Sequence, residues 1–132
     1  PDKCVFGSGI GGCVDYGYDA AHSSADGIVI NNYGAAITSS VWNFTVVGTT
    51  CPLDQRSYSI NVSGQFYSNT GSNTDVSVTT SWPADERLIV AMQCSGGFTS
   101  GDTVKATIRM VGAVAGKAYN VSNAGTFSIK IP

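Results

Sequence analysis

The four cysteines are the residues whose spacing says most about their chemistry. They are Cys4, Cys13, Cys51 and Cys94. A zinc site is disfavoured because no two of them lie two to four residues apart and His22 is the only histidine. An even number of cysteines in a small chain rich in Ser and Thr predicts two disulfides and an oxidising compartment. We favour the pairs Cys4 with Cys13 and Cys51 with Cys94. The crossed pairings stay open, because Cα separations cannot be read from sequence.

Catalysis by a side-chain nucleophile requires a base, and His22 is the one side chain that titrates near neutral pH. It lies among Ala and Ser residues in a segment that we interpret as an exposed loop. Asp85 and Glu86 are adjacent on a turn that follows Pro83, and Asp54 stands alone, so no two carboxylates are spaced for acid and base catalysis. We therefore expect no catalytic residue, metal site or cofactor, and a protein that is not an enzyme.

A Gly-rich segment, residues 7–12, matches the G-x-G-x-x-G pattern of dinucleotide-binding loops through Gly7, Gly9 and Gly12. That chemistry needs a strand before the loop and, after it, a helix whose N-terminus faces the pyrophosphate. Here only six residues precede the pattern, and a strand-like run follows it. We interpret the segment as flexible backbone between two cysteines.

Exposed aromatic side chains could stack on a sugar ligand. Trp82 precedes Pro83 at the end of a predicted strand and is the candidate for ligand stacking. Trp42 lies in the middle of a predicted strand beside Phe44, and we interpret it as a core residue.

Three sequons predict N-glycosylation, beginning at Asn43, Asn61 and Asn120. In a chain this rich in Asn, Ser and Thr, such matches also arise by chance.

The composition predicts the elements that carry these residues. The 132 residues include 14 Val and 9 Ile against 2 Leu and 2 Met, and β-branched side chains favour strands. Seven Lys and Arg against nine Asp and Glu, without a basic cluster, disfavour nucleic acid and anionic membranes as partners. No apolar run approaches the length of a membrane span, and the chain begins at Pro1. We expect either a mature protein or a trimmed piece of one.

Alternation of apolar and polar side chains predicts strands separated by turn residues. The clearest run is residues 104–110, in which Val104 and Ile108 alternate with Lys105 and Arg109. The other predicted strands cover residues 14–19, 27–31, 36–47, 57–62, 66–67, 76–79, 88–94 and 125–131. Residues 68–73 are predicted to form a polar loop, and residues 112–116 a break. The sequence predicts a single all-β domain over residues 1–132, an antiparallel β-sandwich of about 7–9 strands stabilised by disulfides.

An ordered set of motifs spans the first fifty residues. Residues 1–6 (PDKCVF) and a Gly-rich spacer are followed by residues 13–16 (CVDY), residues 28–34 (IVINNYG), and Cys51 after a Val-rich strand. This order resembles the extracellular C-terminal domain of archaeal type IV pilin-like proteins, which are made with a class III signal peptide. The strands at 103–111 and 125–131 are similar to the end of that domain.

The resemblance implies a non-enzymatic head domain displayed on a cell-surface filament, with a role in surface display and adhesion. It implies other pilin subunits as partners, joined through an N-terminal helix that this chain lacks. A surface or glycan ligand is a further expected partner, and this domain alone is expected to make no membrane contact. The alternative that we retain is a secreted adhesive or carbohydrate-binding β-sandwich module.

Overall fold

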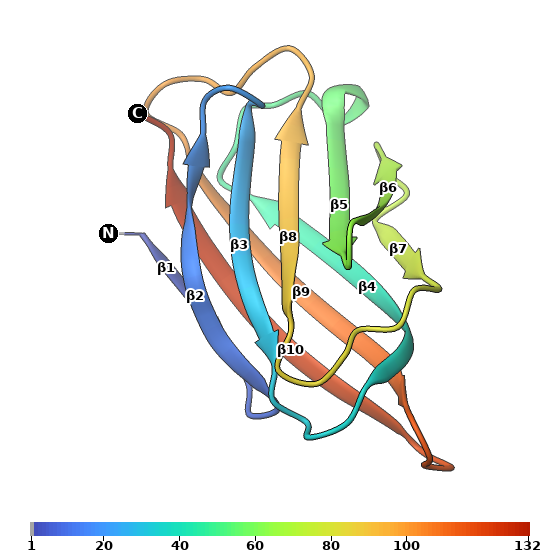
Figure 1. The fold of residues 1–132 in the computed structure, drawn as a ribbon. Helices are drawn as coiled ribbons and strands as arrows, with labels where there is room; N and C mark the ends of the chain where they lie inside the picture. Colours follow the sequence, from blue (N-terminus) through green and yellow to red (C-terminus); the bar gives the residue numbers. More distant parts are fainter. Residues whose placement is uncertain (1) are drawn as a thin grey trace.

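The computed structural model describes residues 2–132, which form ten strands in two antiparallel sheets of five strands (Figure 1). Sheet A has the strand order β1 (Lys3–Phe6), β10 (Asn120–Lys130), β9 (Thr103–Val114), β4 (Ile37–Val47) and β7 (Asp75–Val78). Sheet B has the order β2 (Ile10–Asp19), β3 (Ser24–Asn31), β8 (Arg87–Cys94), β5 (Arg56–Val62) and β6 (Gln65–Thr70). A short 3₁₀ turn, η1 (Leu53–Gln55), precedes β5. The sheets pack face to face, which confirms the predicted antiparallel β-sandwich.

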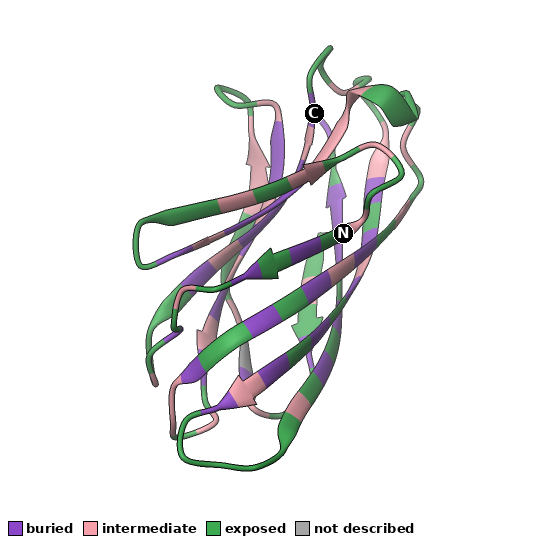
Figure 2. Cartoon of the chain, turned by 90° about the vertical axis from the view of Figure 1, so that its right-hand side faces the viewer, coloured by how far each residue is buried: buried purple, intermediate pink, exposed green. Residues whose placement is uncertain are grey.

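The alternation in the sequence becomes an inner and an outer face on each strand. Along β9, Val104 and Ile108 are fully buried between the sheets, whereas Lys105 and Arg109 are exposed on the outer face of sheet A. Figure 2 shows the same change between buried and exposed residues along neighbouring strands. Burial of the apolar set against the opposite sheet is the main driving force for this pairing.

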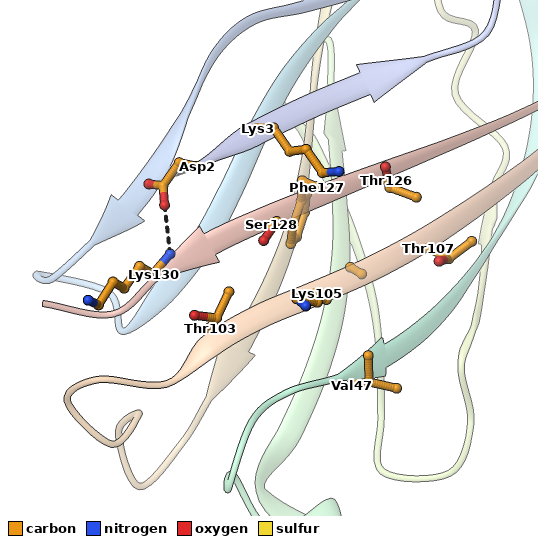
Figure 3. Close-up of a pocket in the computed structure, with 11 residues that line it drawn as sticks. Asp2, Lys3, Val47, Thr103, Lys105, Thr107, Thr126, Phe127, Ser128 and Lys130 are labelled. Atoms are coloured by element: carbon orange, nitrogen blue, oxygen red, sulfur yellow. Dashed lines mark hydrogen bonds between the residues drawn. The ribbon is translucent and has the colours of Figure 1, made fainter.

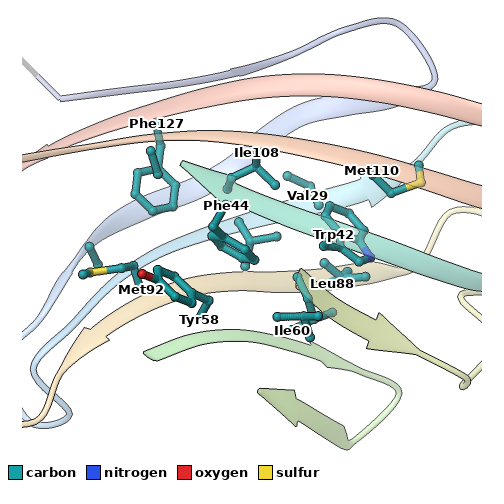
Figure 4. Packing of buried hydrophobic residues seen from close by; sticks show 14 of the residues in the cluster. Val29, Trp42, Phe44, Tyr58, Ile60, Leu88, Met92, Ile108, Met110 and Phe127 are labelled. Atoms are coloured by element: carbon teal, nitrogen blue, oxygen red, sulfur yellow. The ribbon is translucent and has the colours of Figure 1, made fainter. Parts of the chain in front are cut away.

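The core is centred on aromatic side chains from both sheets (Figure 4). Phe44 of β4 contacts Tyr58 of β5 across the sandwich, with ring centroids 5.4 Å apart. The Tyr58 hydroxyl donates a hydrogen bond to the carbonyl of Gly71 at 3.0 Å, so this buried phenol is satisfied. Trp42 is fully buried, as expected from its place in the middle of β4.

One disulfide joins the two sheets, and the other joins the segment after β4 to sheet B. Cys4 of β1 bonds Cys13 of β2 along one edge of the sandwich, with Cα atoms 5.6 Å apart. Cys51, in the segment after β4, bonds Cys94 at the end of β8, with Cα atoms 6.1 Å apart. These are the two pairs favoured from the sequence. Gly27 of β3 makes room for the first bond, because a Cβ atom there would lie 3.3 Å from the Cys4 sulfur.

The strand boundaries differ from the prediction in several places, and β2 and β3 begin four and three residues earlier than predicted. β1 was not predicted, β6 continues to Thr70 through part of the expected polar loop, and β9 continues through Gly112 into the expected break. Gly112 is buried in a strand, and a Cβ atom there would lie 2.6 Å from Ile37 Cγ2. This glycine therefore permits a close approach of β4 rather than a turn. β10 accordingly begins at Asn120, five residues before the predicted start of the last strand.

None of the helical segments among residues 2–132 has the length and apolar character required to cross a membrane.

Candidate functional site

His22 lies in the turn between β2 and β3, where its side chain is 71% exposed. Its Nδ1 atom lies 2.7 Å from Oδ2 of Asp19. This hydrogen bond, together with the charge of Asp19, raises the pKa of His22, and the same bond lowers the pKa of the Asp19 carboxyl. The imidazole therefore forms an exposed ion pair. Its ring contacts a carboxylate rather than a hydroxyl that it could activate.

Of the carboxylates considered as acid and base candidates, Asp85 and Glu86 are adjacent in the turn before β8, and Asp54 lies on a different element, η1. Asp54 is exposed on η1, and Asp85 adopts a positive φ of 64° in the turn before β8. Glu86 accepts a hydrogen bond from the Ser63 hydroxyl at 2.6 Å. Within the part of the chain that the structure describes, no group of three or more His, Cys, Asp or Glu side chains could hold a metal ion.

The Gly-rich segment is held by a side chain from the other end of the chain. Asn123 of β10 accepts a hydrogen bond from the Gly7 amide at 3.0 Å and donates to the carbonyls of Gly7 and Ser8 at 3.2 and 2.9 Å. β2 begins at Ile10, within the motif, so the second half of the segment expected to be flexible backbone is a strand, and no helix follows the motif. This arrangement joins the β1–β2 loop to sheet A and offers no helix N-terminus to a pyrophosphate. The role of Asn123 was not predicted.

Trp82 is a core residue, and the expectation that it could stack on a ligand was wrong. Its side chain is 1% exposed, and its Nε1 donates to the carbonyl of Glu86 at 2.8 Å. A backbone bridge to Ile37 draws the residue inward, because the amide of each donates to the carbonyl of the other. The exposed aromatic side chains do not replace it as a flat platform, since they lie on β2, β6 and the turn after β9: Tyr16, Phe66 and Tyr119.

The three sequons differ in their accessibility. Asn43 is half-buried on β4, and its Nδ2 donates to Thr74 Oγ1 at 3.1 Å and to Asp75 Oδ1 at 2.8 Å. Asn61 is half-buried on β5. Asn120 is exposed at the start of β10, beside the turn of residues 115–119. N-glycosylation at these sites stays a prediction, and Asn120 is the best presented acceptor of the three.

A hollow of about 610 Å³ lies on the outer face of sheet A. Three lysines from adjacent strands line it: Lys3 from β1, Lys130 from β10 and Lys105 from β9 (Figure 3). We call this hollow the lysine groove. Val47 of β4 forms its apolar side and is 57% exposed. Hydroxyl groups complete the lining, from Thr103, Thr107, Thr126 and Ser128.

Within the described part of the chain, no carboxylate lies within 4.0 Å of the ammonium groups of the lysine groove. Asp2 also lines the groove, but its Oδ1 accepts a hydrogen bond from the backbone amide of Lys130 at 2.8 Å. Among residues 2–132, the one ion pair within 4.0 Å joins His22 and Asp19. The groove can therefore attract a carboxylate or another anion.

Sequence reasoning did not find this groove. The alternation along β9 predicted that Lys105 faces outward, but Lys3 and Lys130 reach the same place only through the pairing of β1 with β10. Neither a protein-family model nor a curated protein sequence matches the chain.

Proposed function

We propose that this chain is a non-enzymatic structural domain displayed outside the cell on a filament, similar to the head of an archaeal type IV pilin-like subunit. The observation that carries the proposal is the way in which the first strand is anchored. β1 pairs with β10 from Lys3 to Phe6, and Cys4 is bonded to Cys13 in the opposite sheet. The strand is therefore held by hydrogen bonds on one sheet and covalently on the other.

This anchoring suits a domain that is pulled through a segment joined ahead of it. Tension applied at Asp2 would reach the Cys4–Cys13 bond after two residues and pass through this bond into β2. The hydrogen bonds between the rest of β1 and β10 would then not break. A disulfide also restricts the unfolded chain, which favours persistence of the domain outside the cell. Both disulfides are compatible with an extracellular location, since such bonds persist in oxidising compartments.

The two ends of sheet A suit different roles in a displayed domain: one end for attachment to a filament and the other for exposure to the surroundings. The start of β1 lies beside the end of β10, with Lys3 opposite Ser128. The turn of residues 115–119 and the exposed Asn120 lie at the other end of β10 (Figure 1). A filament segment joined near Asp2 would leave this far turn, with Tyr119 60% exposed, free for contacts or a glycan.

The first test is the coding sequence upstream of Pro1. A short basic leader followed by about twenty apolar residues joined directly to Pro1 would support the proposal. A secretory signal that ends just before Pro1 would contradict it and would favour a free secreted module.

The second test locates the domain on cells that produce it. Antiserum raised against residues 1–132 is applied to whole cells and visualised by immunogold electron microscopy, with a strain lacking the gene as the control. Gold aligned along filaments is expected. Gold confined to the culture medium, or spread evenly over the envelope, would contradict filament display.

A further inference from the structure

The charges of this protein are separated between the two outer faces of the sandwich. The chain carries seven Lys and Arg and nine Asp and Glu. Four of the seven cations lie on the outer face of sheet A: Lys3, Lys105, Arg109 and Lys130. The carboxylates on this face are Asp2 and Asp75. The other seven carboxylates lie elsewhere, so this face is positive although the chain as a whole is negative.

The lysine groove has a defined geometry because strand register sets it. Lys3, Ser128, Lys105 and Val47 are successive partners across β1, β10, β9 and β4. Strands lie about 4.8 Å apart, which puts the Cα atoms of Lys3 and Lys105 about 10 Å from each other. Lys130 follows Ser128 by two residues on β10, about 7 Å further along the strand. The three lysines thus form a triangle around Ser128.

Three aspartates form a comparable cluster on the outer face of sheet B. Asp15 and Asp19 lie on β2, about 14 Å apart along the strand. Asp26 of β3 is paired with Gly17, midway between them. We call Asp15, Asp19 and Asp26 the aspartate patch. Asp26 faces outward because its neighbours on β3, Ala25 and Gly27, are buried. Asp15 and Asp19 lie on the same face, because their register partners, Ile28 and Ser24, are each two residues from Asp26 on β3.

The aspartate patch surrounds a hollow of about 240 Å³ with an apolar side. Ile28 and Ile89, which are register partners on β3 and β8, line this hollow together with the three carboxylates. The aspartate patch therefore combines negative charge with aliphatic side chains. The lysine groove combines positive charge with the exposed side chain of Val47.

We propose that the aspartate patch of one copy of this chain docks into the lysine groove of a second copy. The two surfaces are opposite in sign, with three lysines on one and three aspartates on the other, and each has an apolar residue beside its charges. Among residues 2–132, each cluster brings like charges together without an ion-pair partner within 4.0 Å, apart from the contact of Asp19 with His22. A second copy would neutralise both clusters at once.

The contact joins different surfaces of the two copies, because the groove and the patch lie on opposite sides of the sandwich. Such a head-to-tail contact leaves one free groove and one free patch on every pair, so it extends into rows instead of stopping at a dimer. This inference goes beyond filament display: it names a contact between the β-sandwiches themselves, and it does not require an N-terminal helix.

The test is sedimentation velocity of residues 1–132 over protein concentrations up to about 1 mM, where weak contacts become populated. We expect self-association that weakens about tenfold or more between about 0.05 M and about 0.5 M NaCl, because salt screens exposed charges. The double variant K3E/K105E makes the charge of the lysine groove negative, and D15K/D26K makes the charge of the aspartate patch positive. Each variant alone is expected to stay monomeric under conditions in which the wild type associates. If D15K/D26K fails to fold, D15K alone replaces it, since Asp15 is exposed and its side chain accepts a hydrogen bond from the neighbouring Tyr16 amide.

Mixing the two charge-reversed variants gives the sharpest result. K3E/K105E then presents two negative faces, and D15K/D26K presents two positive faces. Association is therefore expected to return in the mixture. The matched controls are K117E in the exposed turn of residues 115–119 and D54K on η1, which change the net charge away from both surfaces. These controls are expected to associate like the wild type.

Three results would overturn the contact: a wild type that stays monomeric at low salt, a mixture that does not associate, or controls that lose association as the reversed variants do. A monomeric wild type that binds a sulfated polysaccharide column through Lys3 and Lys105 would assign the groove to another polyanion. If the domain is monomeric in solution but immunogold labelling still places it along filaments, this contact is overturned and the proposed display function is not.

Discussion

The indole rings of Trp42 and Trp82 lie with their centroids 5.9 Å apart in the core, although forty residues separate them in the chain. Trp42 belongs to β4, whereas Trp82 lies outside the named strands and is joined to Ile37 by an isolated bridge. Asn31 strengthens this arrangement, because its Nδ2 donates to the carbonyl of Trp82 at 3.0 Å. The segment between β7 and β8 thus supplies one large aromatic side chain to the core.

Replacement of Trp82 should reduce stability rather than ligand binding. We expect Trp82→Ala to lower the free energy of unfolding by about 3 to 5 kcal/mol, because it leaves a cavity in a packed core. Urea denaturation followed by circular dichroism measures this change. Tyr119→Ala is the control, since that ring is 60% exposed and its loss should change stability by less than about 0.5 kcal/mol. Equal effects of the two substitutions would contradict the placement of Trp82 in the core.

The two disulfides should differ in their contribution to stability. Cys51 and Cys94 are separated by 43 residues, and Cys4 and Cys13 by 9. In the chain-entropy model, closing the longer loop stabilises the fold by about 4 kcal/mol and the shorter loop by about 3 kcal/mol. Unfolding in urea of the paired Cys→Ser variants tests this order. A larger loss from the Cys4–Cys13 pair would mean that anchoring of β1 outweighs loop length.

Gly125 should not tolerate a side chain. It is the register partner of Phe6, and a Cβ atom at this position would overlap the Phe6 ring. We expect Gly125→Ala to destabilise the protein by about 1 to 3 kcal/mol, because the ring must leave its place over β10. Gly17→Ala is the matched control, as nothing lies within 4 Å of its Cβ position and its φ is not positive. Thermal unfolding compares the two, and a neutral Gly125→Ala would disprove this packing.

The pair of His22 and Asp19 should make stability depend on pH near neutrality. The hydrogen bond and the charge of Asp19 raise the pKa of His22 above its usual value of about 6.5. A raised pKa in the folded state contributes stability that is complete below about pH 6.5 and disappears as the pH rises through the folded value.

His22 is the only histidine, so its ring protons can be followed by NMR without assignment of others. We expect a higher pKa in the folded protein than in urea, and a return of the pKa toward the unfolded value in Asp19→Asn. If Asp19→Asn leaves the pKa of His22 unchanged, the contact does not persist in solution.

The strand-forming residues were largely predictable from local sequence. Alternation along residues 104–110 identified both the strand and its buried side, because the period of two along a strand requires no knowledge of its neighbours. Turn residues marked most of the boundaries for the same reason. Gly112 was misread as part of a break, since a glycine that permits close packing against Ile37 looks in sequence like one that permits a turn.

The position of each side chain relative to distant residues depended on strand pairing. Trp82 was expected at the surface because its neighbour Pro83 marks a strand end, yet the bridge to Ile37 carries it into the core. The lysine groove has the same origin, because Lys3 and Lys130 are separated by almost the whole chain and meet through the register of β1 with β10. Side-chain alternation is a local property, and the sequence specified it directly. Which strands are neighbours, and therefore which charges share a face, followed from burying all the apolar faces together in one core.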